Sequence, residues 1–207
     1  AILLGLVQGL TEFLPVSSTA HLTLVENLVL GRSMPLAFDV LLHAGTLVAL
    51  GLYFREELRR VVVGIFTGEE EGRRLGGWLL LAMVPTGVLG LATKSLKEAQ
   101  KEHLWMYGVF LWVTAAMLWG ANVRARKVEG RELRAMRWQD ALAIGAIQGL
   151  GGGLGLSRSG STLAMGVFTG LRLPASTRFS FLLGVPTIGA AALMEGRHLL
   201  MPLLRGE

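Results

Sequence analysis

Four apolar stretches of this chain have about the length that a helix needs to cross a lipid bilayer, roughly 20 residues. They are residues 35–54, 77–93, 103–121 and 179–194. The clearest is 103–121, which carries aromatic residues near both ends, where the membrane–water interface favours them. These stretches predict an all-α integral membrane protein that forms a single membrane domain over residues 1–207.

Composition and charge agree with a membrane protein. Hydrophobic residues make up 52% of the chain and the mean hydropathy is +0.52, above the usual apolar share of soluble domains. The net charge of +5 comes from basic residues in short segments between the apolar stretches, which is the positive-inside pattern, and we expect no binding of nucleic acid. The absence of cysteine excludes disulfides and thiolate metal sites.

Two further stretches, 1–30 and 141–171, are apolar on average but contain polar residues that a lipid-facing helix would not tolerate. In the first stretch these residues are Gln8, Thr11, Glu12, Ser17, Ser18, Thr19, His21 and Glu26. We therefore expect two re-entrant helix–loop–helix hairpins, which are allowed where protein or water covers the irregular backbone.

The basic segments predict the orientation. Segments 55–76 and 122–139 are rich in arginine and are separated by two expected spans, so both lie on one side, which the charge bias makes cytoplasmic. Segment 94–102 then lies outside. The first hairpin enters the membrane from the outer face and the second from the cytoplasmic face.

An internal repeat links the two hairpins. A shift of 140 residues places Gly5, Gln8, Gly9, Leu10, Leu14 and Ser17 over Gly145, Gln148, Gly149, Leu150, Leu154 and Ser157. One more residue of offset matches Phe38, Leu41, Leu42, Thr46 and Ala49 with Phe179, Leu182, Leu183, Thr187 and Ala190. Chance agreement between apolar sequences is the alternative, and the matched Gln and Ser residues count against it.

Three expected spans separate the copies, and an odd number inverts the second copy relative to the first. We therefore expect an inverted repeat whose hairpins meet near the bilayer midplane, an arrangement that builds polar sites in many membrane proteins. Repeat one covers about 1–121 and repeat two about 141–207. By the same symmetry, repeat two is expected to lack two C-terminal helices.

The polar residues of the hairpins predict a phosphate site. An intramembrane arginine such as Arg158 is a functional candidate by default, and with flanking hydroxyls and glycine-freed amides it suits a phosphate. Gln8 and Glu12 share one helix face, and Glu12 is a candidate base or ligand for Mg²⁺ or Ca²⁺. His21 is a candidate proton shuttle, and Ser17 or Ser18 a candidate nucleophile.

Each assignment has a purely structural alternative. Glu12 and Arg158 can form an ion pair that only fixes the packing of the two hairpins. The hydroxyls of the serine and threonine residues in the two hairpins, the Ser/Thr cluster, can bond to helix carbonyls. His43 is interpreted as a packing or cavity-lining residue, and Asp39 as an interfacial residue near the end of a span.

The segments QGLTEFLPVSSTAHL and GLSRSGST resemble the two signature motifs of the undecaprenyl-diphosphate phosphatase family, the bacitracin-resistance type of membrane phosphatase. AFDVLLHAGTL and RFSFLLGVP also match its pattern, so the resemblance covers essentially the whole chain. It implies hydrolysis of undecaprenyl diphosphate to undecaprenyl phosphate and inorganic phosphate, with a divalent cation, Mg²⁺ or Ca²⁺, as cofactor. The reaction recycles the lipid carrier of bacterial cell-wall synthesis.

Carried over by position, the resemblance implies roles for eleven residues. The catalytic residues are Glu12, Ser18, His21 and Arg158, with Glu12 also the metal ligand; the pyrophosphate-binding residues are Gln8, Ser17, Thr19, Ser157, Ser159, Gly160 and Thr162. The sequence leaves open whether Ser18, His21 or water attacks the phosphorus. Three departures stand out: Gln8 at the first acidic position, Leu154 where the motif has proline, and about two fewer helices than the family.

The resemblance also implies partners and a location. The partners are a polyprenyl diphosphate substrate and membrane lipids, and we expect a homodimer. The location is the bacterial inner membrane, with a site that faces the outer side. The alternative function is a transporter that flips a prenyl-phosphate lipid without cleaving it, since inverted repeats are typical of transporters. The Glu, Ser and His residues beside Arg158 favour chemistry over transport.

Overall fold

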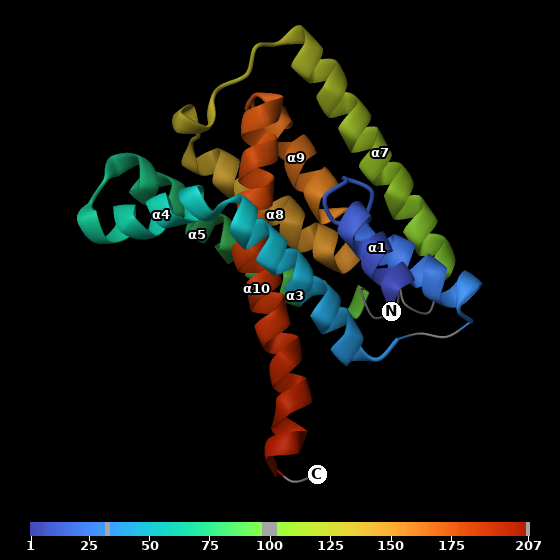
Figure 1. Cartoon of the computed structure of the whole chain (residues 1–207). Coiled ribbons are helices and arrows are strands. Elements are labelled where there is room, and N and C mark those ends of the chain that lie inside the picture. Colours follow the sequence, from blue (N-terminus) through green and yellow to red (C-terminus); the bar gives the residue numbers. More distant parts are fainter. Residues whose placement is uncertain (32–33, 97–102, 206–207) are drawn as a thin grey trace.

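The structure is a computed structural model that describes residues 1–31, 34–96 and 103–205 (Figure 1). Within those ranges the chain is almost entirely helical and forms no strand, only an isolated bridge between Arg131 and Leu171. The elements in order are α1 (Ile2–Thr11), α2 (Ser18–Leu24), a π-helical turn (Val25–Val29), α3 (Leu36–Tyr53), α4 (Arg55–Thr67), α5 (Glu70–Ala92), α7 (Leu104–Lys127), a 3-10 turn (Leu133–Ala135), α8 (Trp138–Leu154), α9 (Arg158–Phe168) and α10 (Leu173–Arg205).

Three helices in the described part of the chain are long and apolar enough to cross a membrane: α5, α7 and the Leu173–Met194 part of α10. Helices α3 and α4 form a fourth candidate as a pair, with a bend of 75° between them. The expected spans at 77–93, 103–121 and 179–194 match the three long helices, with one residue of each of the first two falling just outside, and 35–54 corresponds to α3. The prediction of an all-α integral membrane protein is confirmed.

Three helices extend beyond the expected spans. Helix α5 begins at Glu70 instead of 77, α7 continues to Lys127, and α10 begins at Leu173 instead of 179 and continues to Arg205. Hydropathy ends a span at its first charged residue, whereas a helix continues into the polar region until a residue stops it. Helix α4 shows such a stop, because Gly68 adopts a left-handed conformation (φ 80°) directly after it.

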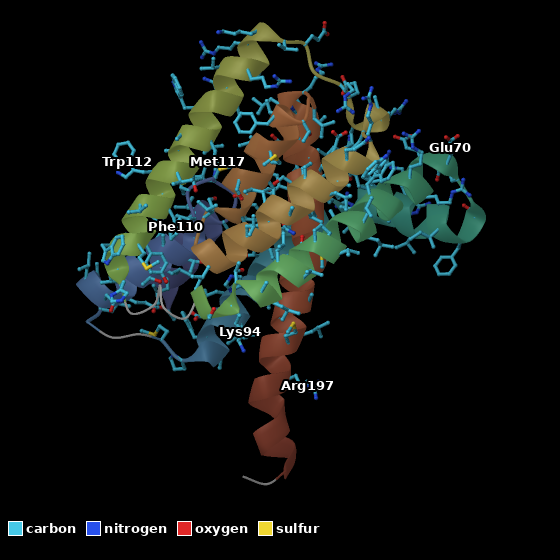
Figure 2. All side chains as sticks on the ribbon, turned by 180° about the vertical axis from the view of Figure 1, so that it is seen from behind. Glu70, Lys94, Phe110, Trp112, Met117 and Arg197 are labelled. Atoms are coloured by element: carbon cyan, nitrogen blue, oxygen red, sulfur yellow. The ribbon has the colours of Figure 1, made fainter. Side chains whose placement is uncertain are left out.

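Large apolar side chains cover the outside of the bundle. On α7, Trp105, Trp112 and Trp119 recur every two turns and are 67%, 79% and 72% exposed, and Figure 2 shows Trp112 pointing away from the other helices. Helix α5 carries a similar exposed stripe of Leu80, Val84, Val88 and Leu91. A soluble domain rarely exposes so much contiguous apolar surface, whereas lipid tails contact it favourably.

Two glycines on α8 allow α5 and α8 to pack closely. A Cβ atom added to Gly145 would lie 2.1 Å from the carbonyl oxygen of Ala82, and one added to Gly149 would lie 2.8 Å from that of Thr86. The Thr86 hydroxyl also lies 3.0 Å from the carbonyl oxygen of Gly145. Small residues four apart are a common device for close packing of membrane helices. This contact fixes α8, the helix that leads into α9.

Both expected hairpins have a helix–loop–helix structure. The first consists of α1, a turn and α2. In the second, α8 ends at Leu154, directly before Gly155 (φ 71°), and the run 151–154 forms its last turn rather than a loop. In Figure 1, α1 lies beside the ends of α8 and α9. Entry of the hairpins into a bilayer and the inverted order of the repeats remain predictions. Residues 97–102 of the expected outer segment and 206–207 of repeat two lie outside the described residues.

Candidate active site

Glu12 is the point where the two hairpins meet. It follows α1 directly, and its side chain is 8% exposed. One carboxylate oxygen, Oε1, accepts a hydrogen bond of 2.8 Å from Nη2 of Arg158, the first residue of α9. The other, Oε2, accepts hydrogen bonds from Nε2 of Gln8, at 3.2 Å, and from the hydroxyl of Ser18. Four of the residues expected at the site are therefore in direct contact, across 146 residues of sequence.

The local sequence of the first hairpin explains this geometry. Gln8 and Glu12 lie one turn apart at the end of α1, so their side chains point in the same direction. The turn that follows contains Pro15, whose ring fixes φ and cannot extend a helix. Ser18 is the first residue of α2, so the reversal of the chain returns its hydroxyl to Glu12.

Ser17 makes this reversal in an unfavourable conformation. Among the described residues it is the sole non-glycine with positive φ, at 66° with ψ 94°. Such a conformation costs about 1–3 kcal/mol for a residue with a side chain and often accompanies function. The carbonyl oxygen of Ser17 lies 3.2 Å from the backbone nitrogen of His21 and 2.9 Å from its Nδ1.

The contact between His21 and Ser17 fixes the state of the imidazole. A carbonyl oxygen only accepts hydrogen bonds, so Nδ1 must carry the hydrogen. In the neutral ring the lone pair is then on Nε2. His21 is half-buried, and Nε2 is therefore the nitrogen that is chemically able to take up a proton.

The second hairpin packs against the first through small and polar residues. The Ser157 hydroxyl accepts a 3.2 Å hydrogen bond from the backbone nitrogen of Gly160, which caps α9, and the Ser159 hydroxyl lies 3.4 Å from the carbonyl oxygen of Leu14. A Cβ atom added to Gly160 would lie 2.7 Å from Cγ2 of Thr114 and 3.0 Å from the carbonyl oxygen of Pro15. Gly160 is needed for this close approach, and its expected role in phosphate binding remains a prediction.

Part of the Ser/Thr cluster bonds to the helix backbone, as the structural alternative proposed. Thr162 is fully buried; its hydroxyl lies 2.7 Å from the carbonyl oxygen of Arg158 and also contacts the Ser180 hydroxyl. Thr19 differs from the rest because its side chain is exposed on α2. The roles of these two residues in pyrophosphate binding remain predictions, as do those of Ser17, Ser157 and Ser159.

Two buried polar atoms of the site have no hydrogen-bond partner among the described residues: Nη1 of Arg158 and Oε1 of Gln8. Buried polar groups are normally paired, because leaving one unpaired costs about 1–3 kcal/mol. An unpaired guanidinium nitrogen suits an anionic oxygen, and an unpaired amide oxygen suits a cation or a hydroxyl. A purely structural Glu12–Arg158 pair does not account for either atom, whereas a bound phosphate with a cation accounts for both.

Sequence reasoning missed several residues that support the site. Gly184 on α10 lies against the Arg158 guanidinium, since a Cβ atom there would be 2.5 Å from Nη1. Thr46 on α3 accepts a 3.3 Å hydrogen bond from Gln8, and Thr114 on α7 accepts one of 3.2 Å from the backbone of Ser157. His43, interpreted as a packing residue, is close enough to Glu12 for the two to interact electrostatically. The match of Thr46 with Thr187 in the repeat was the sequence signal for the contact of Thr46 with Gln8.

The described residues contain no group of three or more His, Cys, Asp or Glu side chains that could hold a metal ion. The oxygen ligands available are the Glu12 carboxylate and Oε1 of Gln8. Mg²⁺ is commonly bound by one or two protein ligands together with substrate phosphates and water. These residues therefore fit a divalent cation whose remaining ligands come from water and from a bound phosphate.

Comparison with known proteins identifies the family. The model of the family "Bacitracin resistance protein BacA" matches residues 1–205. Undecaprenyl-diphosphatase 1 of Pseudoalteromonas translucida is 36% identical over 211 residues, which is 100% of this chain and 77% of that relative. The undecaprenyl-diphosphatase of Syntrophotalea carbinolica is 41% identical over 199 residues, 94% of this chain and 75% of the relative. This chain belongs to the bacitracin resistance protein BacA family.

Proposed function

We propose that this protein hydrolyses undecaprenyl diphosphate to undecaprenyl phosphate and inorganic phosphate, and so recycles the lipid carrier for cell-wall synthesis. The observation that carries the proposal is the buried contact of Ser18 and Arg158 with the two oxygens of Glu12. It combines a hydroxyl, a base and an anion-binding cation in one place. The names of the relatives support the same reaction, and the transporter alternative has no such support.

In the first step, Ser18 attacks the terminal phosphorus. Glu12 accepts the hydroxyl proton through Oε2, the oxygen to which that hydroxyl already donates, and a bond forms between the Ser18 oxygen and phosphorus. The bond from phosphorus to the bridging oxygen breaks, and undecaprenyl phosphate leaves with that oxygen. The free Nη1 of Arg158 donates to the phosphoryl oxygens while Nη2 holds Glu12 in place.

In the second step, water hydrolyses the phosphoserine. Nε2 of His21, whose lone pair is fixed by the contact of Nδ1 with Ser17, accepts a proton from the attacking water. The bond from phosphorus to the Ser18 oxygen breaks and inorganic phosphate leaves. Ser18 recovers its proton from Glu12, and Nε2 of His21 passes the proton taken from water to the departing phosphate or to solvent, which returns the site to its starting state.

A divalent cation, Mg²⁺ or Ca²⁺, is part of this proposal. Oε1 of Gln8 and the Glu12 carboxylate are the residues that would hold it. When bound, it neutralises negative charge on the pyrophosphate oxygens.

The location and partners complete the proposal. We place the protein in the inner membrane of a bacterium, with the site toward the outer face and the prenyl chain among the membrane lipids. The clustering of Arg124, Arg126, Lys127 and Arg134 after the apolar part of α7 supports this orientation, because such segments stay cytoplasmic. A homodimer remains our prediction.

The test is release of phosphate from undecaprenyl diphosphate by the purified protein in detergent, with and without Mg²⁺ or Ca²⁺. We expect Arg158→Ala to lower kcat/KM by about 10²–10³, the usual cost of losing a donor to developing charge. Glu12→Gln should cost about 10²–10⁴, the usual contribution of a general base. Binding of the lipid without turnover by the unmodified protein would contradict the enzyme proposal and favour the transporter.

The nucleophile is tested separately. With substrate labelled in its terminal phosphate, acid quenching of the unmodified protein should trap a label on serine, and Ser18→Ala should remove it. Phosphoserine survives acid whereas phosphohistidine does not, so an acid-labile label would assign the attack to His21. Full turnover without any trapped label, including in Ser18→Ala, would assign it to water.

A further inference from the structure

Thr46 on α3 contacts Gln8, the residue whose amide also contacts Glu12. Nε2 of Gln8 donates one hydrogen to Oε2 of Glu12, at 3.2 Å, and the other to Oγ1 of Thr46, at 3.3 Å. The hydroxyl of Thr46 in turn donates to the carbonyl oxygen of Leu42, one helical turn earlier in α3. Gln8 is 2% and Thr46 5% exposed, so water has little access to these groups.

This chain of hydrogen bonds fixes which way the Gln8 amide faces. A threonine hydroxyl has one hydrogen, and Thr46 uses it on Leu42, so toward Gln8 it can only accept. An ionised Glu12 can also only accept. Turning the amide over would place Oε1 against the Glu12 carboxylate, a repulsive contact, and Thr46 could then bond to Oε1 only by giving up its hydrogen bond to Leu42. The present orientation leaves Oε1 as the free end of the amide.

The second copy of the repeat contains the same arrangement without the carboxylate. Nε2 of Gln148 donates to Oγ1 of Thr187 at 2.9 Å and to Oγ1 of Thr86 at 3.1 Å. The hydroxyls of these two threonines donate to the carbonyl oxygens of Leu183 and Ala82, and Oε1 of Gln148 is again unpaired among the described residues. The position that matches Glu12 is Gly152. Thr187 therefore orients an amide that serves helix packing, whereas Thr46 orients one that contacts the site.

We propose that Thr46 is a positioning residue for the reaction, acting through Gln8. By orienting the amide, it keeps an N–H group on Oε2 of Glu12 and presents Oε1 of Gln8 to a divalent cation. This inference rests on the proposed function. It assigns Thr46 a role that packing of α3 against α1 alone does not require.

The variants Thr46→Val, Thr46→Ser and Thr187→Val separate positioning from packing. Valine has nearly the shape of threonine but no hydroxyl, serine keeps the hydroxyl, and Thr187→Val removes the matched hydrogen bond away from the site. Removal of a group that orients a metal ligand typically costs about 10- to 100-fold in metal affinity or activity. We expect Thr46→Val to raise the Mg²⁺ concentration for half-maximal phosphate release by that factor, Thr46→Ser to restore it, and Thr187→Val to leave it unchanged.

Binding of Mn²⁺ in the presence of a non-hydrolysable methylene diphosphonate, which supplies the phosphate oxygens, gives a readout without turnover; the same mixture without protein is the blank. Loss of the electron paramagnetic resonance signal of free Mn²⁺ reports binding, and we expect Thr46→Val to weaken it by a similar factor. The unfolding temperature of each variant in detergent is measured beside it. If Thr46→Val does not fold, it is replaced by Thr46→Ala. Alanine removes bulk instead of placing a methyl group beside the amide. Equal cation dependence in Thr46→Val and Thr187→Val would overturn the inference.

A double-mutant cycle tests whether Thr46 acts through Gln8. In a Gln8→Leu background no amide remains to be oriented, so adding Thr46→Val should change neither Mn²⁺ affinity nor the Mg²⁺ dependence further. Additive effects of the two substitutions would contradict the inference that Thr46 acts through Gln8. Absence of phosphate release by the unmodified protein would contradict the proposed function, and the cycle in Mn²⁺ affinity would still decide the role of Thr46.

Discussion

At the scale of single residues, the positive φ of Ser17 makes a prediction about stability. Ser17→Gly removes both the hydroxyl and the backbone strain, whereas Ser17→Ala removes the hydroxyl alone. We expect the glycine variant to be more stable than the alanine variant by about 1 kcal/mol, the lower end of the cost of such a conformation. Thermal unfolding of the two variants in detergent measures the difference. Identical unfolding temperatures would show that the turn stores no strain.

Phosphate release by the same two variants tests whether the strained turn at Ser17 contributes to turnover. The turn at Ser17 directs the next residue, Ser18, toward Glu12. A glycine allows more backbone conformations than alanine, and we expect it to lower turnover relative to alanine despite the gain in stability. Higher turnover in the glycine variant would mean that the strained turn has no role in placing Ser18.

The residues that meet at the candidate site could be predicted from the sequence, but those that support them could not. Glu12 and Arg158 stand out because a charge is costly in an apolar segment, and Ser18 and His21 because they belong to the same motif. Thr46 is marked only by its match with Thr187 in the repeat, and Gly184 carries no mark, since threonine and glycine are ordinary residues of membrane helices. The role of Thr46 depends on its contact with Gln8, 38 residues away in the sequence. The role of Gly184 depends on its contact with Arg158, which belongs to another helix.

At the scale of elements, the start of α8 is held by a buried ion pair. Asp140 is 3% exposed, and its two oxygens accept hydrogen bonds of 2.8 and 2.9 Å from Arg131 and one of 2.7 Å from the backbone nitrogen of Arg137. Arg131 also donates to the carbonyl oxygen of Thr169, just after α9. The pair therefore ties the connection between α7 and α8 to the end of the second hairpin.

Asp140→Asn keeps the shape of the side chain and removes its charge. We expect the free energy of unfolding at neutral pH to fall by about 1–3 kcal/mol, because hydrogen bonds of a buried charged group are lost. The matched control is Glu71→Gln, whose pair with Arg134 is exposed and should contribute little. Thermal unfolding of the three proteins in detergent measures both effects. A loss as small as that of the control would contradict the prediction.

The effect of Asp140 should also depend on pH. Burial raises the pKa of Asp140, but the hydrogen bonds from Arg131 and Arg137 and the charge of Arg131 outweigh it, so the pKa in the folded protein lies below its ordinary value. Its contribution to stability is therefore complete above the unfolded pKa of about 3.9 and is lost as the pH falls through the folded pKa. The difference in unfolding temperature between the unmodified protein and Asp140→Asn should stay constant from pH 7 to about 4. At lower pH the difference should decrease toward zero. A difference that closes nearer neutral pH would contradict this.

The helices themselves could be predicted where the apolar pattern was strong. The three long spans were found because about 20 apolar residues permit few other structures in a membrane protein. Helix α4 and the start of α5 were not found, because the run of arginines from Arg55 to Arg74 was interpreted as a connecting segment. Charged residues at the membrane surface can continue a helix, since the backbone hydrogen bonds do not depend on the side chains.

At the scale of the whole molecule, the proposed orientation can be tested because the chain has no cysteine. Lys94→Cys follows α5 on the predicted outer side, and Arg134→Cys lies between α7 and α8 on the predicted cytoplasmic side. In intact cells we expect a membrane-impermeant maleimide to label the first variant and not the second. Permeabilised cells, in which both should be labelled, are the control. Labelling of the second variant alone would mean the opposite orientation.

The ion pair between Glu12 and Arg158 has a consequence for biosynthesis. The ribosome makes the carboxylate first and the guanidinium 146 residues later. Throughout that interval the nascent chain holds an acidic group in a largely apolar hairpin without its cationic partner. The contact between the two hairpins therefore cannot form before α9 has been synthesised, so the centre of the site assembles only after the helices between the two hairpins have been made.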